Sequence, residues 1–127
     1  MDVILHITSR SHWQHAQQAS AYCADSLDSE GFIHCSTPNQ VVWVANTFYQ
    51  GQSGLVLLCI APSQVQPELR YDEIETGERF PHIYGPLNLD AVIQVLEFEP
   101  DTAGRFVLPG AIAFSRVQTF KLISSRS

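Results

Sequence analysis

The sequence predicts an α+β fold, in which two early helices pack on a sheet of largely antiparallel strands. Two observations support this class. Strand and helix patterns alternate only at the start of the chain, in the order strand, helix, strand, helix. From residue 55 onward the pattern is almost entirely strands and turns, which does not fit a doubly wound α/β fold. The 127 residues are typical of one domain, because two domains would each have a marginal core.

The first four elements follow from local patterns. Residues 3–8 are a short apolar run that predicts a buried strand. Ser11 has the chemistry of a helix cap and precedes a helix predicted over residues 12–24. Residues 25–30 form a polar connection, and the alternating, β-rich residues 32–36 predict the second strand.

The second helix and the central strand have the clearest signals. Thr37 and Pro38 have the pattern of a helix cap followed by proline, and they predict a helix that opens at residue 38 and runs to about residue 50. Its apolar residues recur at helical spacing and form one broad stripe. Residues 55–60 are the most apolar run of the chain and predict a central strand.

The remainder is read as strands separated by glycine and proline turns. Strands are predicted over residues 69–74, 80–84, 91–98 and 106–108. Residues 110–127 form a tail with an apolar first half and an end rich in serine and arginine. The tail is consistent either with a terminal helix or with frayed chain.

Charge and cysteine content limit the function classes. The chain has 13 acidic and 7 basic side chains, a formal net charge of -6, which argues against a binder of nucleic-acid backbones. No secretory signal and no membrane-spanning apolar stretch is visible. The cysteines are odd in number and have apolar neighbours, so we expect three reduced, buried thiols and a cytoplasmic location; they are Cys23, Cys35 and Cys59.

Two histidines interrupt apolar strands. His6 is followed by Thr8, and His34 is followed by Ser36 and Thr37, so each strand carries an imidazole and then hydroxyl groups near its end. A buried imidazole needs hydrogen-bond partners, and ligands are often held where strands pass into loops. Each histidine alone is also compatible with a satisfied core residue.

Residues 80–86 are the third element with chemical potential. His82 and Tyr84 are two apart in a strand, so their rings share one face. An imidazole titrates near neutral pH, which makes His82 a candidate general acid or base. The alternative is a stiff connection with Tyr84 in the core. We expect His12 and His15 to be solvated residues of a surface helix, and the sequence contains no spacing that is typical of metal ligands.

These blocks resemble a known family. Residues 5–8 (Leu-His-Ile-Thr), 31–37 (Gly-Phe-Ile-His-Cys-Ser-Thr), 40–41 (Gln-Val) and 80–86 (Phe-Pro-His-Ile-Tyr-Gly-Pro) are similar to those of the family labelled domain of unknown function 952. The resemblance covers one domain, residues 1–109, and leaves the tail 110–127 outside. It implies a compact relative of the ADP-ribosyltransferase fold, a split and largely antiparallel sheet.

The resemblance also implies roles. His6 takes the position that contacts ribose, and His34 the position of the second motif residue, which also resembles the His-x-Ser motif of RNA 2′-phosphotransferases. The glutamate of many such transferases is missing, because residues 80–84 stand in its place. The arginine set of the phosphotransferases is also missing. The fold therefore carries over more safely than the activity.

The sequence supports one leading function and two alternatives. The leading expectation is a cleft for a nucleotide-like small molecule, NAD or an ADP-ribose derivative, with ADP-ribosyl- or phosphotransferase-type chemistry. His34 and His82 would be catalytic, and the expected ligand-binding residues are His6, Thr8, Ser36, Thr37 and Tyr84. NAD would be a substrate, and no resident cofactor, metal, membrane or nucleic-acid partner is expected. The alternatives are a non-catalytic binding module and a structural interaction domain.

Overall fold

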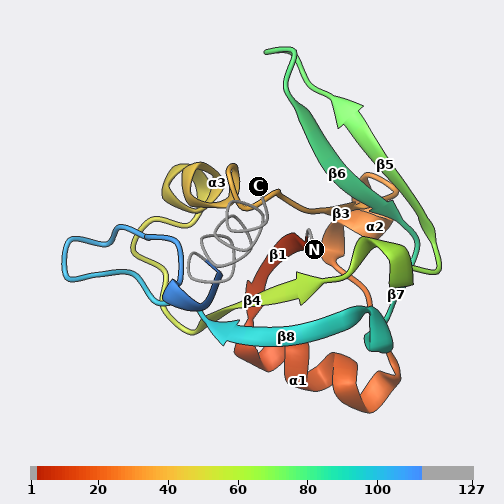
Figure 1. The fold of residues 1–127 in the computed structure, drawn as a ribbon. Helices are drawn as coiled ribbons and strands as arrows, with labels where there is room; N and C mark the ends of the chain where they lie inside the picture. The colour runs from red at the N-terminus through yellow and green to blue at the C-terminus, as the bar shows by residue number, and fades with distance from the viewer. Residues whose placement is uncertain (1–2, 113–127) are drawn as a thin grey trace, which may run out of the picture.

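A computed structural model describes residues 3–112 and confirms the α+β class with antiparallel strand pairing (Figure 1). The first sheet contains β1 (Ile4–Ser9), β4 (Leu55–Ile60) and β8 (Val92–Glu97), in the order β1-β4-β8. Both neighbours run antiparallel to β4, which is therefore the central strand that the apolar run predicted.

Two smaller sheets complete the strand pairing. One contains β3 (Ile33–His34), β6 (Arg79–Tyr84) and β5 (Glu68–Glu73), in the order β3-β6-β5. The other pairs β2 (Ala21–Tyr22) with β7 (Leu87–Asn88). All of these pairs are antiparallel as well.

Helices α1 (Arg10–Ala19) and α3 (Val41–Phe48) cover the two faces of the first sheet, and the short α2 (Asp25–Ser29) packs beside β3. The chain also contains the short 3-10 turns η1 (Pro62–Gln64) and η2 (Leu89–Ala91). Figure 1 shows α1 and α3 on opposite sides of β4.

The alternation of β4 explains this arrangement. Its six residues are all buried, because alternate side chains enter two different cores. Leu58 packs on the side of Ala16 in α1, and Leu57 packs on the side of Ala45 in α3. A central strand with helices on both faces reads as a continuous apolar run.

The sheets meet at a split next to β1. Leu5 and Ser36 exchange two backbone hydrogen bonds, N to O distances of 2.7 and 2.8 Å, which join β1 to the residues after β3. One residue earlier, Cys35 donates to Pro81 of β6 at 3.0 Å. The chain after β3 thus changes partner from β6 to β1, and the two sheets diverge beyond this point.

Several predicted boundaries are wrong for local reasons. The helix predicted at 12–24 begins at Arg10, because Ser9 rather than Ser11 caps it by accepting from the His12 backbone N–H at 3.1 Å. It ends at Ala19, because Ser20 adopts a left-handed conformation and β2 follows. The polar connection at 25–30 contains the short helix α2.

The second helix and two strands also differ from expectation. The helix predicted to open at residue 38 begins at Val41, because residues 37–40 form a turn in which the Thr37 carbonyl accepts from the Gln40 and Val41 N–H groups. The strand predicted at 32–36 reduces to β3 and the Ser36 bridge. Residues 106–108 form no strand. The predicted tail from residue 113 lies outside the described residues.

Asn46 explains how residues 106–108 are fixed without a strand. Its side-chain amide accepts from the Phe106 N–H at 2.7 Å and donates to the Phe106 carbonyl at 3.1 Å. Phe106 is buried and stacks at a tilt on Phe98, with ring centroids 4.8 Å apart. One polar side chain on α3 therefore replaces the partner strand.

We expect Asn46→Ala to lower the free energy of unfolding by roughly 1–3 kcal/mol, because it leaves two buried backbone groups unpaired. Urea denaturation measures the loss, and amide hydrogen exchange at Phe106 should accelerate with it. Thr47→Ala, an exposed position on the same helix, is the control and should change stability by less than about 0.5 kcal/mol. Equal effects of both variants would contradict this role for Asn46.

Candidate functional site

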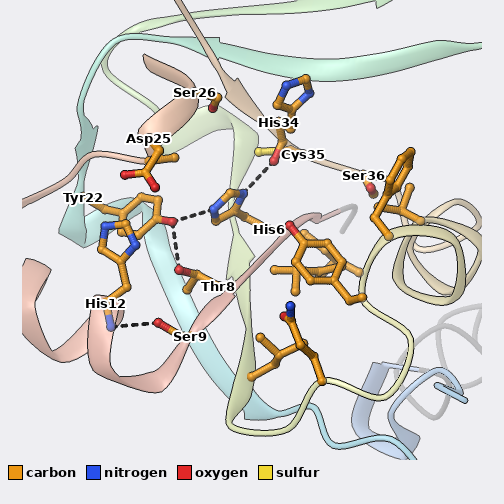
Figure 2. Close-up of a pocket in the computed structure, with 18 of the residues that line it drawn as sticks. His6, Thr8, Ser9, His12, Tyr22, Asp25, Ser26, His34, Cys35 and Ser36 are labelled. Carbon is orange, nitrogen blue, oxygen red and sulfur yellow. Dashed lines mark hydrogen bonds between the residues drawn. The ribbon is translucent and has the colours of Figure 1, made fainter. Parts of the chain in front are cut away.

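A cavity of about 740 Å³ lies along β1, between α2 on one side and α3 on the other. Figure 2 shows His6 in its middle, with Tyr22, His12 and Asp25 to one side and Ser36 to the other. The cavity borders the split between the sheets, because β1 supplies several consecutive lining residues and Ser36 follows β3.

His6 bridges the split with its side chain. Its Nδ1 lies 2.6 Å from the backbone carbonyl oxygen of His34, and its Nε2 lies 2.7 Å from the Tyr22 hydroxyl. A carbonyl can only accept, so Nδ1 carries the proton and Nε2 is the acceptor in the neutral ring. In a continuous sheet a backbone N–H of the neighbouring strand would donate to the His34 carbonyl. Here the N–H of the His6 imidazole takes its place.

The protons of the next two groups follow from this tautomer. Tyr22 gives its single proton to His6 Nε2. The Thr8 hydroxyl lies 2.9 Å from the Tyr22 oxygen, and in this contact Thr8 donates its proton to Tyr22. Figure 2 shows this chain of contacts along one side of the cavity.

Burial keeps this network uncharged. Desolvation lowers the pKa of His6 to about 4, although its hydrogen bond to the His34 carbonyl opposes the shift. Desolvation also raises the pKa of Tyr22 to about 12. At neutral pH both groups are therefore neutral, and the network acts through hydrogen bonds rather than charge.

The backbone of β1 offers a second set of polar groups. Alternate residues of a strand direct their N–H and C=O groups to the same edge. Leu5 uses that edge to pair with Ser36, and Ile7, two residues on, directs its N–H and C=O to the same side. Beyond the split no described residue pairs with these Ile7 groups, and Ile7 lines the cavity.

Two side chains present polar atoms to the cavity without a protein partner among residues 3–112. The Ser36 residue is only 5% exposed, and its hydroxyl makes no hydrogen bond in this part of the chain. Since no fully buried polar side-chain atom there lacks a partner, its Oγ opens into the space that the residue lines. The Asp25 carboxylate at the rim also forms no ion pair with a described residue.

The wall formed by α3 and the loop after it is mostly apolar, with Gln52 as a polar residue of the loop. Val44, Phe48 and Tyr49 line it, opposite the polar groups of β1 and α2. Burial raises the pKa of the Tyr49 phenol, so that hydroxyl stays protonated and can donate to a ligand. The cavity is therefore amphipathic, a common property of small-molecule sites.

The His34 ring stands at the edge of the cavity. Its side chain is 54% exposed, and its Nε2 lies 3.0 Å from Glu30, which also lines the cavity. Its ring meets the rings of Phe32 and His82 edge-on, with centroids 4.8 and 5.3 Å away.

His82 and Tyr84 belong to a neighbouring cluster on the face of the β3-β6-β5 sheet. His82 is buried under Phe32, whose ring stacks on it at 4.0 Å. The Asp72 carboxylate accepts from His82 Nδ1 at 2.8 Å and from the Tyr84 hydroxyl at 2.5 Å. The hydrogen bond from Tyr84 and, to a smaller extent, the one from His82 hold the pKa of the Asp72 carboxyl below its ordinary value. Arg70 lies over the Tyr84 ring.

The structure brings four of the predicted site residues into one cavity and leaves three outside its lining. His6, Thr8, His34 and Ser36 line it. The expected convergence of residues 80–84 on the same cavity is wrong, because His82 and Tyr84 lie behind Phe32 and bond to Asp72. Thr37 is also not among the lining residues, because the chain has turned toward α3 there.

Sequence reasoning missed Tyr22, Asp25 and Asp72. Tyr22 falls inside the helix predicted over residues 12–24, and Asp25 falls in the polar connection at residues 25–30. Asp72 falls in the strand predicted over residues 69–74, and no local pattern marks any of the three as a site residue. Asp72 does lie in register with Phe80 of β6, a pairing that would have placed it beside His82.

The cysteine that lines the cavity is poorly suited to act as a nucleophile. Cys35 lines the cavity but is buried, and desolvation strongly raises the pKa of its thiol. Desolvation also raises the pKa of Cys59 to about 11. All three cysteines are free, but Cys23 is exposed rather than buried as predicted, since it follows β2 at the surface.

In the described part of the chain, no three or more His, Cys, Asp or Glu side chains lie close enough together to hold a metal ion. Among residues 3–112, no helix has the length and apolar character needed to cross a bilayer.

Comparisons with known proteins give a consistent family and fold. The model of the family described as "Protein of unknown function (DUF952)" matches residues 7–95. Two crystal structures of protein CC0527 from Caulobacter crescentus, one of a double mutant, are similar to this chain at 29% identity, with TM-scores of 0.81 and 0.80. Each match covers 87% of this chain and 98% of the other.

The solution structure of CC0527 is similar as well. It shares 30% identity, with a TM-score of 0.72, and the match covers 81% of this chain and 90% of that protein. A comparison with curated proteins finds no match. The name CC0527 states no activity.

We expect the free energy of unfolding to fall as the pH drops from about 6.5 to about 4, because the unfolded chain then protonates His6 while the folded chain does not. The total loss is on the order of 3 kcal/mol. Denaturant titrations across this pH range measure it. In His6→Asn, which cannot titrate, this part of the pH dependence should disappear.

The exposed His15→Asn variant is the matched control and should keep the pH dependence of the wild type. An unchanged pH dependence in His6→Asn would show that His6 is not buried in its neutral form.

Proposed function

The chain belongs to the family described as Protein of unknown function (DUF952), and we propose that its cavity binds a nucleoside-type ligand such as NAD or an ADP-ribose derivative. One observation carries this proposal. The cavity combines hydroxyl and carboxylate groups on one side, an open strand edge in the middle and an aromatic wall on the other side. These are the groups that a ribose, an amide-bearing ring and a flat base require.

Each part of such a ligand has a complement. Vicinal ribose hydroxyls donate well to a carboxylate. The Asp25 carboxylate forms no ion pair with a described residue and is therefore available to accept from these hydroxyls. A carboxamide offers both N–H donors and a carbonyl acceptor, so it can pair with the Ile7 C=O and N–H at the same time. A heteroaromatic ring packs against Tyr49 and Phe48. The volume lies within the range of small-molecule sites.

The charge of the cavity lining favours ADP-ribosyl-type transfer over phosphotransferase chemistry within the proposal. It includes no lysine or arginine, the side chains that usually hold phosphate groups. A phosphotransferase reaction inside the cavity is therefore poorly supported, and the phosphates of a nucleotide would point outward. ADP-ribosyl-type transfer stays part of the proposal, with an ADP-ribosyltransferase-like fold and with His34 at the edge of the cavity as its proton-transferring group.

Binding without catalysis is the second candidate, and the hydrogen bonds of His6 favour it. Both ring nitrogens have protein partners, so this residue positions the cavity wall and has no free nitrogen for a substrate. His82, the other predicted catalytic residue, would reach a ligand only past Phe32 and His34. Thr37 and Tyr84 would contact only the parts of a ligand that extend beyond the cavity.

The test is a binding panel followed by NMR chemical-shift changes of the backbone amides. Nicotinamide riboside, adenosine, NAD and ADP-ribose should shift the amides of residues that line the cavity, whereas inorganic phosphate should not. Filling the cavity with Val44→Trp should weaken binding at least about tenfold, because the new ring occupies the space of the ligand.

Thr47→Trp places the same side chain on an exposed position of α3 and should leave binding unchanged. Shifts that occur elsewhere on the protein, or affinities that Val44→Trp does not alter, would contradict the proposal.

A further inference from the structure

The charges around the cavity are unbalanced. Its lining contains two carboxylates, Asp25 and Glu30, and no lysine or arginine. Of its three histidines, His6 is neutral at physiological pH because burial lowers its pKa to about 4. The charged side chains of the lining are therefore two carboxylates, both on exposed residues at its edge, with no lysine or arginine among them.

None of the four arginines in residues 3–112 lines the cavity. Three of them pair with carboxylates outside it: Arg10 with Glu97, Arg70 with Glu68 at 2.7 and 3.0 Å, and Arg79 with Glu73. Glu30 has a partner in His34, but Asp25 has no ion-pair partner in residues 3–112. Asp25 is thus the unbalanced charge of the cavity. Its charge also contributes to the raised pKa of Tyr22, the residue in the middle of the hydrogen-bonded network.

A separate feature indicates that a ligand belongs in this space. The Ser36 hydroxyl is almost fully enclosed, opens into the cavity and has no protein partner in the described part of the chain. A polar atom in this setting is satisfied only by water or by a ligand. Ser36 lies on the other side of His6 from Asp25, so a ligand that contacts both spans the cavity (Figure 2).

We propose that the cavity selects a positively charged ring, an N-ribosylated aromatic cation of the pyridinium type, over its neutral counterpart. This inference rests on the proposed function and specifies its ligand class. The carboxylate of Asp25 attracts the cation through space, and the aromatic side chains of Tyr49 and Phe48, which line the cavity, favour a cation over a neutral ring. The phosphates of a nucleotide ligand would lie outside the cavity, away from these carboxylates.

A redox pair isolates the charge from the shape of the ligand. Nicotinamide riboside carries a positive ring, and its 1,4-dihydro form is neutral with almost the same size and the same hydroxyl and amide groups. Calorimetric titration should give an affinity at least about tenfold higher for the cation at low salt. This preference should shrink when the ionic strength rises, because exposed charges are screened.

Asp25→Asn tests the residue behind the preference. The amide keeps a hydrogen-bond acceptor at the position of the carboxylate and removes the charge. The cation should lose affinity until the two forms differ by less than about threefold, while the neutral form binds as before. Asp28→Asn, on the same helix but outside the cavity lining, removes the same charge from the protein and should keep the preference.

The outcomes separate the two proposals. If both riboside forms bind wild-type protein with equal affinity, the charge selection is wrong and the nucleoside cavity stands. The selection is also wrong if Asp25→Asn keeps the full preference. If neither form produces heat or cavity shifts, the proposed function itself fails.

Discussion

The hydrogen bond from the His6 imidazole to the His34 carbonyl is the constraint on which the site depends. It is a side chain acting where a backbone donor would act in a continuous sheet. Because of it, β1 and the chain after β3 can diverge beyond the Leu5–Ser36 pair without leaving the His34 carbonyl unsatisfied. The split opens the cavity, and the same bond fixes the imidazole tautomer that orders the hydroxyls of Tyr22 and Thr8.

The polar residues of the cavity fall into two groups with different roles. His6 and Tyr22 are satisfied within the protein and neutral, so they shape the cavity wall. Asp25 and Ser36 keep polar atoms open and are the groups available to a ligand. The Asp72 cluster under Phe32 is a separate, adjoining unit, and it contacts the cavity lining through the His34 ring and through the hydrogen bond from Ser26 to the Phe32 carbonyl.

Local signals predicted the longer strands and four of the residues that line the cavity. The β4 run and the histidines of β1 and β3 were visible, because apolar strands with single polar interruptions stand out in a sequence. The contribution of Tyr22 was not visible, because it depends on a left-handed Ser20 that ends α1 early. The separation of His82 from the cavity depends on the stacking of Phe32 and on Asp72 of a different strand, and such tertiary contacts leave no local pattern.

The open edge of β1 has an evolutionary consequence. The Ile7 groups that border the cavity are main-chain atoms, so nineteen of the twenty amino acids would present the same donor and acceptor there, and proline alone would remove the donor. A recognition element of this kind survives the drift of side chains. The same pair of main-chain groups can therefore persist between proteins whose sequences have diverged as far as this chain and CC0527, while the side chains around it are free to change the shape and charge of the cavity.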